Sequence, residues 1–384
     1  MSAITGASAC RAGRNIRARG VIMGVASGCH GQGRGHFGAR PGAVAQVFAG
    51  PPQPPHTAAM RPPFAVDNTA DPTHAPALCG PLRRPRQMLA EQVYDGHKSI
   101  HDDATAAGLG LRAGPIKGPT HFSQFDPLLV QMFGLAWFET GCISAHRQTM
   151  VVEGEAVRAF VQPPAAGARS TRIWAEKSDG TPVLTGTASV GAAPGQPSEI
   201  EHRLAKLRPA ARLVINRDLR VGQLGAGNPE TVCMGFDTPM GPHYPFSLAD
   251  KLKLITEPSP WYMPAGGAAS PWGRAILPIE MISVLLGSTL DQAALRGHGP
   301  AVGLFAGQQI RLIQGPLFVD KTYELEREII ALSERARTES VLVRTRARAA
   351  SSRLPVAEMA LNSATLKASY ARYDAERQAL GAAR

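Results

Sequence analysis

The chain has 384 residues and a formal net charge of +11, which is unevenly spread along it. The first 87 residues contain ten arginines, no lysine and only Asp67 and Asp71 as acids, so they hold +8 of that charge. The rest of the chain is nearly neutral, which excludes a uniformly basic surface for nucleic acid. No apolar run approaches the roughly 18 residues that a membrane span needs, so we expect a soluble protein.

Cysteine usage and the missing cofactor motifs narrow the class further. Only Cys142 and Cys233 lie after residue 88, while Cys10, Cys29 and Cys79 lie before it. This spacing predicts neither a disulfide framework nor a zinc site, and it fits the reducing cytoplasm. The sequence has no Gly-x-Gly-x-x-Gly loop after a strand and no Walker motif, so no metal or redox cofactor is expected.

Residues 1–87 are rich in Gly, Pro, Ala and Arg and lack periodic apolar spacing. Such a segment cannot bury enough apolar surface to offset its ordering entropy, so it is predicted to be disordered. Three origins stay open. The segment is translated upstream sequence with the true start at Met88, or an Arg-rich mitochondrial transit peptide, or a flexible arm. Its Pro and Gly content makes a poor amphipathic helix, which weighs against the transit peptide.

The chain after Met88 repeats one pattern of elements. In the first copy, apolar residues from Phe122 to Ala136 recur at helical spacing, and Asp126-Pro127 predicts a helix start or kink. Three strand-like segments follow, and an Asp-Gly hairpin turn at 179–180 joins the last two. These strands are predicted over 150–161, 171–180 and 181–191.

The second copy has an apolar helix within 270–288 and strands over 316–332, 338–350 and 354–370. Its last strand lies roughly 170 residues after its counterpart. A connector over 192–221 carries a short polar helix, EIEHRLAKL. A fully apolar helix followed by antiparallel strands predicts an α+β architecture, in which each sheet curls around its helix.

The loop HDDATAAGLGLRAGPIKGPTHF, which begins at His101, resembles the MaoC-like branch of the hotdog superfamily. That branch contains the (R)-specific enoyl-CoA hydratases and related acyl dehydratases. Its members show Asn-Pro-hydrophobic-His, then an acid and an Ala, then Pro-Ile-Ala-His-Gly leading into the central helix. Ile100-His101, Asp103 and Ala107 match this order, and Pro115-Ile116-Lys117-Gly118 occupies the last motif.

The resemblance covers about residues 94–370 and implies a double hotdog fold. The units are then an N-terminal hotdog over 88–191, the connector, and a C-terminal hotdog over 222–384. Two departures from the family pattern stand out. The catalytic Asp of the family precedes the His by five residues, where this chain has Gly96, and Asp95 lies one residue farther away. In the second half, Ser247 of Tyr244-Pro245-Phe246-Ser247 replaces the His, so that half is expected to shape the acyl tunnel or the partner surface.

The resemblance implies that an enoyl-CoA thioester is the substrate and that water is added or removed. His101 and Asp95 would then be catalytic. A helix start carries unpaired N–H groups that can polarise the thioester oxygen, which assigns substrate binding to Gly118 and Thr120. Tyr244 is a further substrate-binding candidate. Lys117, or Arg274 at the second helix, would meet the phosphates of coenzyme A.

Other interpretations stay open. The chain is alternatively a thioesterase, or an acyl-thioester-binding protein that has lost its catalytic pair. His101 is then a surface or capping residue, and Asp102 and Asp103 serve the helix that follows. A working site in the second half would comprise His243, Tyr244 and Asp250. Four residues near the first helix are expected to be structural: His121, His146, Glu139 and Asp126. Cytoplasmic fatty acid metabolism is the expected setting, with no nucleic-acid or membrane partner and homodimerisation left open.

Overall fold

The computed structural model describes residues 64, 69–70, 74, 76–94, 97–192, 194–208, 210, 212–227 and 229–382. All of them belong to one compact unit, residues 62–384. Residues 1–63, Asp95 and Gly96 lie outside the described residues, and so does most of the segment predicted to be disordered.

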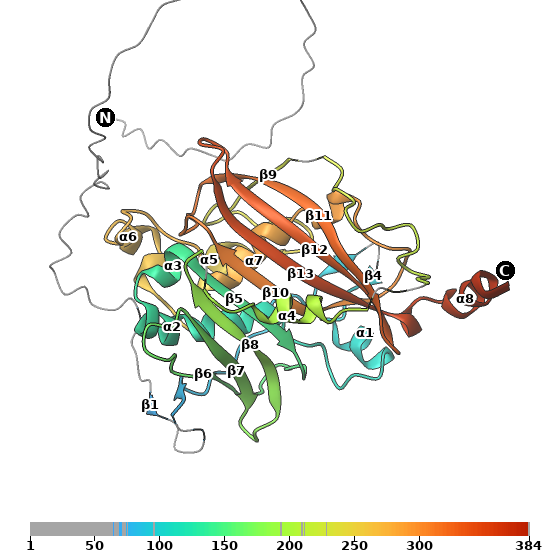
Figure 1. The fold of residues 1–384 in the computed structure, drawn as a ribbon, viewed down its shortest axis with the longest axis horizontal. Helices are drawn as coiled ribbons and strands as arrows, with labels where there is room; N and C mark the ends of the chain where they lie inside the picture. Colours follow the sequence, from blue (N-terminus) through green and yellow to red (C-terminus); the bar gives the residue numbers. More distant parts are fainter. Residues whose placement is uncertain are drawn as a thin grey trace, which may run out of the picture. The chain divides into compact units, whose positions relative to one another are not determined.

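The first half of this unit contains two small strand pairs, the first central helix and four longer strands (Figure 1). In chain order these are β1 (Thr69–Ala70), β2 (Leu78–Cys79), β3 (Val93–Tyr94), β4 (His97–Lys98), α1 (Asp103–Gly108), the 3-10 helix η1 (Gly118–Phe125), α2 (Asp126–Phe133), α3 (Ala136–Thr140), β5 (Gly141–Arg147), β6 (Val157–Val161), β7 (Ser170–Lys177) and β8 (Pro182–Val190).

The connector carries α4 (Glu199–Ala205), and the second half repeats the helix-then-strands order. Its elements are β9 (Glu230–Cys233), α5 (Leu248–Leu252), η2 (Pro260–Tyr262), α6 (Pro264–Gly267), α7 (Ile279–Gly287), η3 (Leu290–Ala293), β10 (Gly303–Leu312), β11 (Thr322–Glu334), β12 (Thr338–Ala349), β13 (Pro355–Leu366), η4 (Lys367–Ser369) and α8 (Tyr373–Ala382).

In the described part of the chain, eleven strands form one antiparallel sheet in the order β1-β2-β6-β7-β8-β5-β10-β13-β12-β11-β9. Read outward from its centre, each half has the same order: β5, β8, β7, β6, β2 matches β10, β13, β12, β11, β9. The two halves meet where β5 pairs with β10, with Ile143 opposite Ile310. This arrangement, with each half-sheet curled around its own helix, is the double hotdog fold predicted from the sequence.

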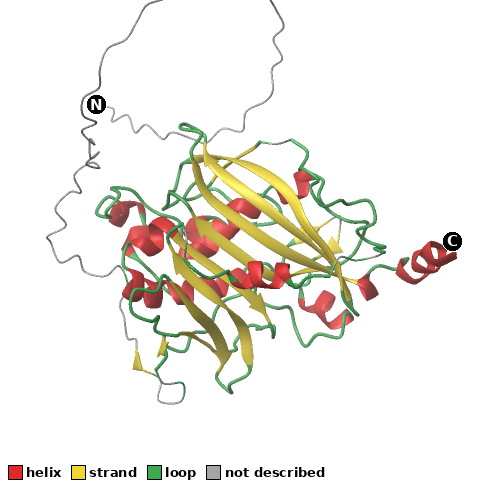
Figure 2. Ribbon diagram, viewed as in Figure 1, coloured by secondary structure: helices red, strands yellow, loops and turns green. Residues whose placement is uncertain are grey.

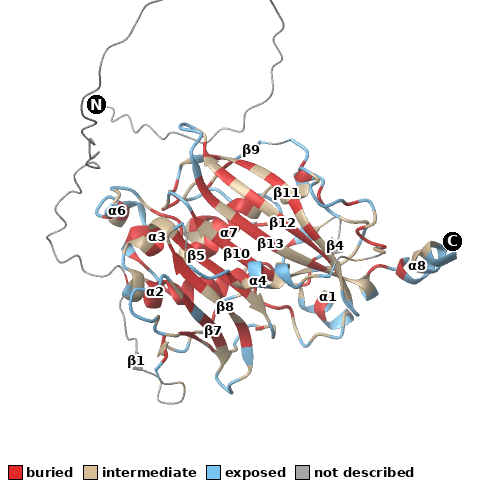
Figure 3. Ribbon diagram, viewed as in Figure 1, coloured by how far each residue is buried: buried red, intermediate tan, exposed pale blue. Residues whose placement is uncertain are grey.

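The two central helices provide the core (Figure 2). The first runs from η1 into α2, and α2 begins at the Asp126-Pro127 step, as predicted. The second is α7, in which every residue from Ile279 to Leu286 is buried. Figure 3 shows buried residues concentrated in α7, α2 and the middle of the strands. The helices share one apolar cluster with the inner face of the sheet.

The connector helix α4 covers the outer face of the sheet. Its Ile200 packs on Ala331, Leu342 and Ala360, whereas Met359 and Leu361, one residue either side of Ala360, face the central helices. A capping box begins α4: Ser198 Oγ accepts the Glu201 N–H, and the Glu201 carboxylate accepts the Ser198 N–H. The short helix predicted in the connector is therefore confirmed.

The prediction that the chain is disordered up to residue 87 is wrong for residues 76–87. β2 pairs with β6, and Cys79 is buried against Phe160 and Trp174. Arg83 forms a two-pronged ion pair with the buried Glu257 of the second half, at 2.7 and 2.8 Å. Since β2 occupies the place that β9 holds in the second half, this segment supplies the fifth strand of the first repeat, and β1 pairs with it at the edge of the sheet. β2 has only two residues, too few to show an apolar alternation, so the Pro- and Gly-rich composition alone predicted disorder.

Candidate functional site

A cavity of about 380 Å³ is lined by both halves of the double hotdog. The first half contributes the loop around His101 and the beginning of η1 at Gly118. The second half contributes Tyr244, one end of α7 and the inner faces of β12 and β13. The lining is mostly apolar and includes polar side chains from both halves, among them His101, His243 and His298, which is the usual make-up of a small-molecule site.

His101 is half-buried and lines this cavity. Its Nδ1 lies 2.5 Å from the carbonyl oxygen of Pro115, three residues before the helix start. A carbonyl oxygen can only accept, so Nδ1 carries the hydrogen and the neutral ring keeps its lone pair on Nε2. Burial lowers the pKa of His101 from 6.5 to about 4, the hydrogen bond to Pro115 opposes this, and the charge of Lys117 adds to it. The ring is therefore a neutral base at pH 7.

The acids that follow His101 hold the loop together. Asp102 is the N-cap of α1, where its side chain accepts the Thr105 N–H at 2.9 Å. Asp103 accepts the Gly114 N–H at 2.8 Å. A Cβ on Gly114 would stand 2.2 Å from the His101 carbonyl oxygen, so the two segments pack closely only because residue 114 is glycine. Asp95, the predicted partner of His101, lies outside the described residues, and its role stays a prediction.

Of the three residues predicted to bind substrate at the beginning of η1, only two line the cavity. Gly118 and Lys117 line the cavity. Thr120 does not, and its N–H donates to the Lys117 carbonyl at 3.0 Å, so the expectation that it offers a free N–H is wrong. The hydrogen bonds of a 3-10 helix join residues three apart, so the N–H of Thr120 is already paired within the helix. The N–H of Gly118 precedes the first such bond and remains available to a ligand. Lys117 is buried rather than open to solvent, 7 % exposed, with its Nζ 4.2 Å from the ring centre of Tyr244.

Arg147, at the end of β5, is a cavity residue that the sequence did not reveal. Its guanidinium lies against Gly118: a Cβ on that residue would stand 1.6 Å from Arg147 Nε. Burial lowers the pKa of Arg147 to about 9. The strand β5 was not predicted from the sequence, so nothing distinguished Arg147 from a solvent-exposed surface arginine.

The second half supplies a different set of groups. Tyr244 and His243 line the cavity, and His243 Nε2 lies 3.2 Å from the Asp291 carboxylate, with the Tyr94 ring stacked on the imidazole at 4.1 Å. Asp250, predicted as a partner of His243, instead forms a capping box with Ser247 at the start of α5. Ser247 thus holds the cap position of Asp102, so Phe246, rather than Ser247, stands where His101 stands in the first half.

Asp126 and Glu139, two of the residues expected to be structural, have contacts that agree with that role. Asp126 is buried and accepts hydrogen bonds from Trp137 Nε1 at 2.8 Å and Tyr262 Oη at 3.1 Å. The Trp272 indole donates to Glu139 at 3.3 Å. His146 does not line the cavity, whereas His121 does, and burial lowers the pKa of His121 to about 3. Arg274 lies over the Phe318 ring, five residues before α7 begins, and not at the helix start.

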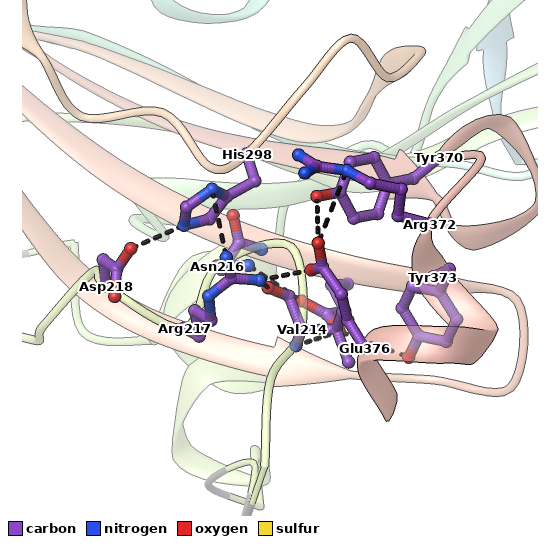
Figure 4. Close-up of polar contacts among 10 residues, drawn as sticks. Val214, Asn216, Arg217, Asp218, His298, Tyr370, Arg372, Tyr373 and Glu376 are labelled. Carbon is purple, nitrogen blue, oxygen red and sulfur yellow. Dashed lines mark hydrogen bonds and ion pairs between the residues drawn. The ribbon is translucent and has the colours of Figure 1, made fainter. Parts of the chain in front are cut away.

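A polar network fixes the far wall of the cavity (Figure 4). His298, a lining residue, contacts Asp218 through Nε2 at 2.5 Å, while Arg217 pairs with Glu376 of α8. The buried Glu339 accepts the N–H groups of Val214 and Asn216 at 2.8 and 3.0 Å. These contacts tie the connector to the sheet, to α8 and to the loop before β10, so we assign this network a structural role.

The described residues contain no group of three or more His, Cys, Asp or Glu side chains placed to hold a metal ion. Within the same part of the chain, no helix has both the length and the apolar character to cross a membrane.

The chain was compared with known proteins. No family model matches the sequence, and no curated protein matches it either. Solved structures do resemble it. A MaoC domain protein dehydratase from Chloroflexus aurantiacus has 15% identity over 73% of this chain and 88% of its own, with a TM-score of 0.43. A double hotdog protein from Mycobacterium tuberculosis has 11% identity over 69% and 86%, with a TM-score of 0.40. An oleoyl thioesterase from Lactobacillus plantarum has 12% identity over 76% and 98%, with a TM-score of 0.36.

Proposed function

We propose that this chain is an acyl-CoA hydratase or dehydratase that adds water to, or removes it from, an enoyl thioester held in the 380 Å³ cavity. One observation carries the proposal. A neutral imidazole, His101, lines the same cavity as the start of the first central helix, with Nδ1 held by Pro115 and the lone pair on Nε2. A base and a helix start near one carbonyl are what conjugate addition of water needs.

The proton path can run through His101 alone. Nε2 takes a proton from water as the oxygen adds to the β-carbon, and the electron pair of the double bond moves toward the thioester oxygen. The Gly118 N–H and the positive end of η1 stabilise that developing negative charge. The imidazolium then returns its proton to the α-carbon, which regenerates the neutral base and balances the reaction.

The test is an assay with crotonyl-CoA that follows the loss of enoyl absorbance. The His101→Ala variant should lose on the order of 10²- to 10⁴-fold in kcat/KM while keeping its circular dichroism spectrum. His146→Ala is the matched control, because His146 lies one residue before Arg147 on β5 but outside the cavity. Equal losses in both variants would contradict the assignment of His101.

The pH profile provides a second readout of the same residue. Protonation removes the lone pair of His101, so kcat/KM should fall as the pH drops through about 4 and stay level from about pH 5 to neutrality. An unperturbed histidine would place this limb near 6.5. A limb near 6.5 that persists in His101→Ala would assign the base to another residue.

Two other functions are outcomes of the same assay. Release of free coenzyme A from saturated acyl-CoAs, without hydration of crotonyl-CoA, would make the chain a thioesterase. Binding of acyl-CoAs without any turnover would make it a non-catalytic acyl-thioester-binding protein. Action in cytoplasmic fatty acid metabolism, without a metal or redox cofactor, is part of the proposal.

A further inference from the structure

Lys117 is an unusual residue to find at the beginning of a buried helix. It is 7 % exposed, and its Nζ is buried without a hydrogen-bond partner among the described residues. The ammonium lies between two aromatic rings that line the cavity, 4.2 Å from the ring centre of Tyr244 and 5.9 Å from that of Phe305. A cation–π contact stabilises such a charge by much less than burial costs it.

A second cation, Arg147, lies beside it. Nε and Nη1 of Arg147 are buried and have no hydrogen-bond partner among the described residues, while Nη2 donates to Gln308 at 3.4 Å. Its guanidinium packs on Gly118, the residue that follows Lys117, and the positive charge of Arg147 is one of the causes that lower the pKa of Lys117. Lys117, Arg147 and the start of η1 therefore concentrate positive charge at one end of the cavity.

No carboxylate of a described residue pairs with either cation. The acid whose charge raises the pKa of Lys117, Glu280 of α7, pairs with Lys251 through Oε2 at 2.6 Å, and its buried Oε1 has no hydrogen-bond partner among the described residues. The other two buried cations among the described residues are paired with carboxylates: Lys251 with Glu280, and Arg327, with no exposed side-chain surface, with Glu230 at 2.9 Å. Burial without a counterion lowers the pKa of both Lys117 and Arg147, so two unpartnered basic groups on one cavity indicate an anion that is supplied from outside the chain and holds them charged.

We propose that Lys117 and Arg147 bind a carboxylate on the acyl chain of the substrate. This inference rests on the proposed function and narrows its substrate to acyl thioesters that carry a second acid group. A thioester oxygen is neutral in the ground state and would leave both cations uncompensated. A carboxylate has two oxygens, one for the ammonium and one for the guanidinium, and needs little room. On binding, the ammonium would exchange the Tyr244 ring for a charged partner.

Calorimetric titration of the full chain with matched ligands tests this. Succinyl-CoA and butyryl-CoA have the same chain length and differ in a terminal carboxylate against a methyl group. Succinyl-CoA should bind at least about tenfold more tightly. Lys117→Met should abolish that preference by weakening the binding of succinyl-CoA far more than that of butyryl-CoA, without lowering the melting temperature, since methionine fills the same space without a charge. Lys253→Met, which removes an exposed lysine, is the control.

The possible outcomes separate the inference from the function on which it rests. Equal affinity for the two thioesters, with crotonyl-CoA still hydrated, overturns the carboxylate site and keeps the hydratase. Failure of all acyl-CoAs to bind overturns both. If free coenzyme A binds as tightly as butyryl-CoA, and Lys117→Met weakens both equally, the cations bind a phosphate of the coenzyme, which also overturns the carboxylate site.

Discussion

The two halves of this molecule share one architecture but differ where each central helix begins. In the first half, Lys117-Gly118 precedes the helix, with His101 beside it. In the second half, Pro278-Ile279 occupies the same place: the segments before both helices form equivalent bridges, Pro115 with Val152 and Ile276 with Phe318. The first helix start opens on a cavity, whereas the second is fully packed.

Charge follows the same division. In the second half, Glu280 in the first turn of α7 is buried and neutralised by Lys251. In the first half, Lys117 is buried and has no such partner among the described residues. The comparison teaches that one copy of a duplicated fold can be packed for stability while the other keeps the unpaired groups that bind ligands. Tyr244 shows the division of labour, because it belongs to the packed half but forms the wall on which Lys117 lies.

The largest expected effect concerns the outer strand of the first half. A chain that starts at Met88 lacks β2, the counterpart of β9, and it lacks Arg83. Glu257 is then buried without the arginine that neutralises it. We expect the free energy of unfolding in urea to fall by about 3–5 kcal/mol. A chain that starts at Met60 retains all described residues and is the control. Equal unfolding free energies of the two chains would show that β2 and Arg83 do not stabilise the first half as β9 would the second.

The second prediction concerns Gly118, whose place is taken by Ile279 in the packed half. Gly118→Ala places a Cβ where Arg147 Nε now lies, so the guanidinium must leave the helix start. A displacement of about 1 Å at a reacting centre costs on the order of 10²-fold in rate, and we expect kcat/KM for the best substrate to fall by that factor. Gly108→Ala is the control, since nothing lies within 4 Å of its Cβ position. Unchanged kinetics in Gly118→Ala would show that this helix start takes no part in the reaction.

The smallest effect tests the equivalence of the helix caps. Ser247→Ala removes the side-chain acceptor at the start of α5, as Asp102→Ala does at the start of α1. Each should lower the unfolding free energy by about 1 kcal/mol. Only Asp102→Ala should also reduce activity, because Asp102 adjoins His101. If Ser247→Ala reduced activity more than Asp102→Ala, the working site would belong to the second half.

Much of the scaffold could be predicted from the sequence. The apolar period from Phe122 to Ala136, the Asp126-Pro127 helix start and the Asp-Gly turn at 179–180 are local signals, and each element appears where it was expected. Both strands at the centre of the sheet, β5 and β10, were not predicted. Each has a run of consecutive buried residues, 141–145 in β5 and 307–310 in β10, so neither shows the clean alternation of a half-exposed strand.

The sequence by itself determined the repeated order of helix and strands, and the presence of a histidine loop before the first helix. Such features depend on side-chain periods and turn residues within a few positions of each other. Only the tertiary structure decided which groups face the cavity: it brought Arg147 against Gly118, used the Thr120 N–H inside the helix, and paired His243 with Asp291 instead of Asp250. Those contacts join residues far apart in the chain, and no local pattern records whether a buried charge has found a partner.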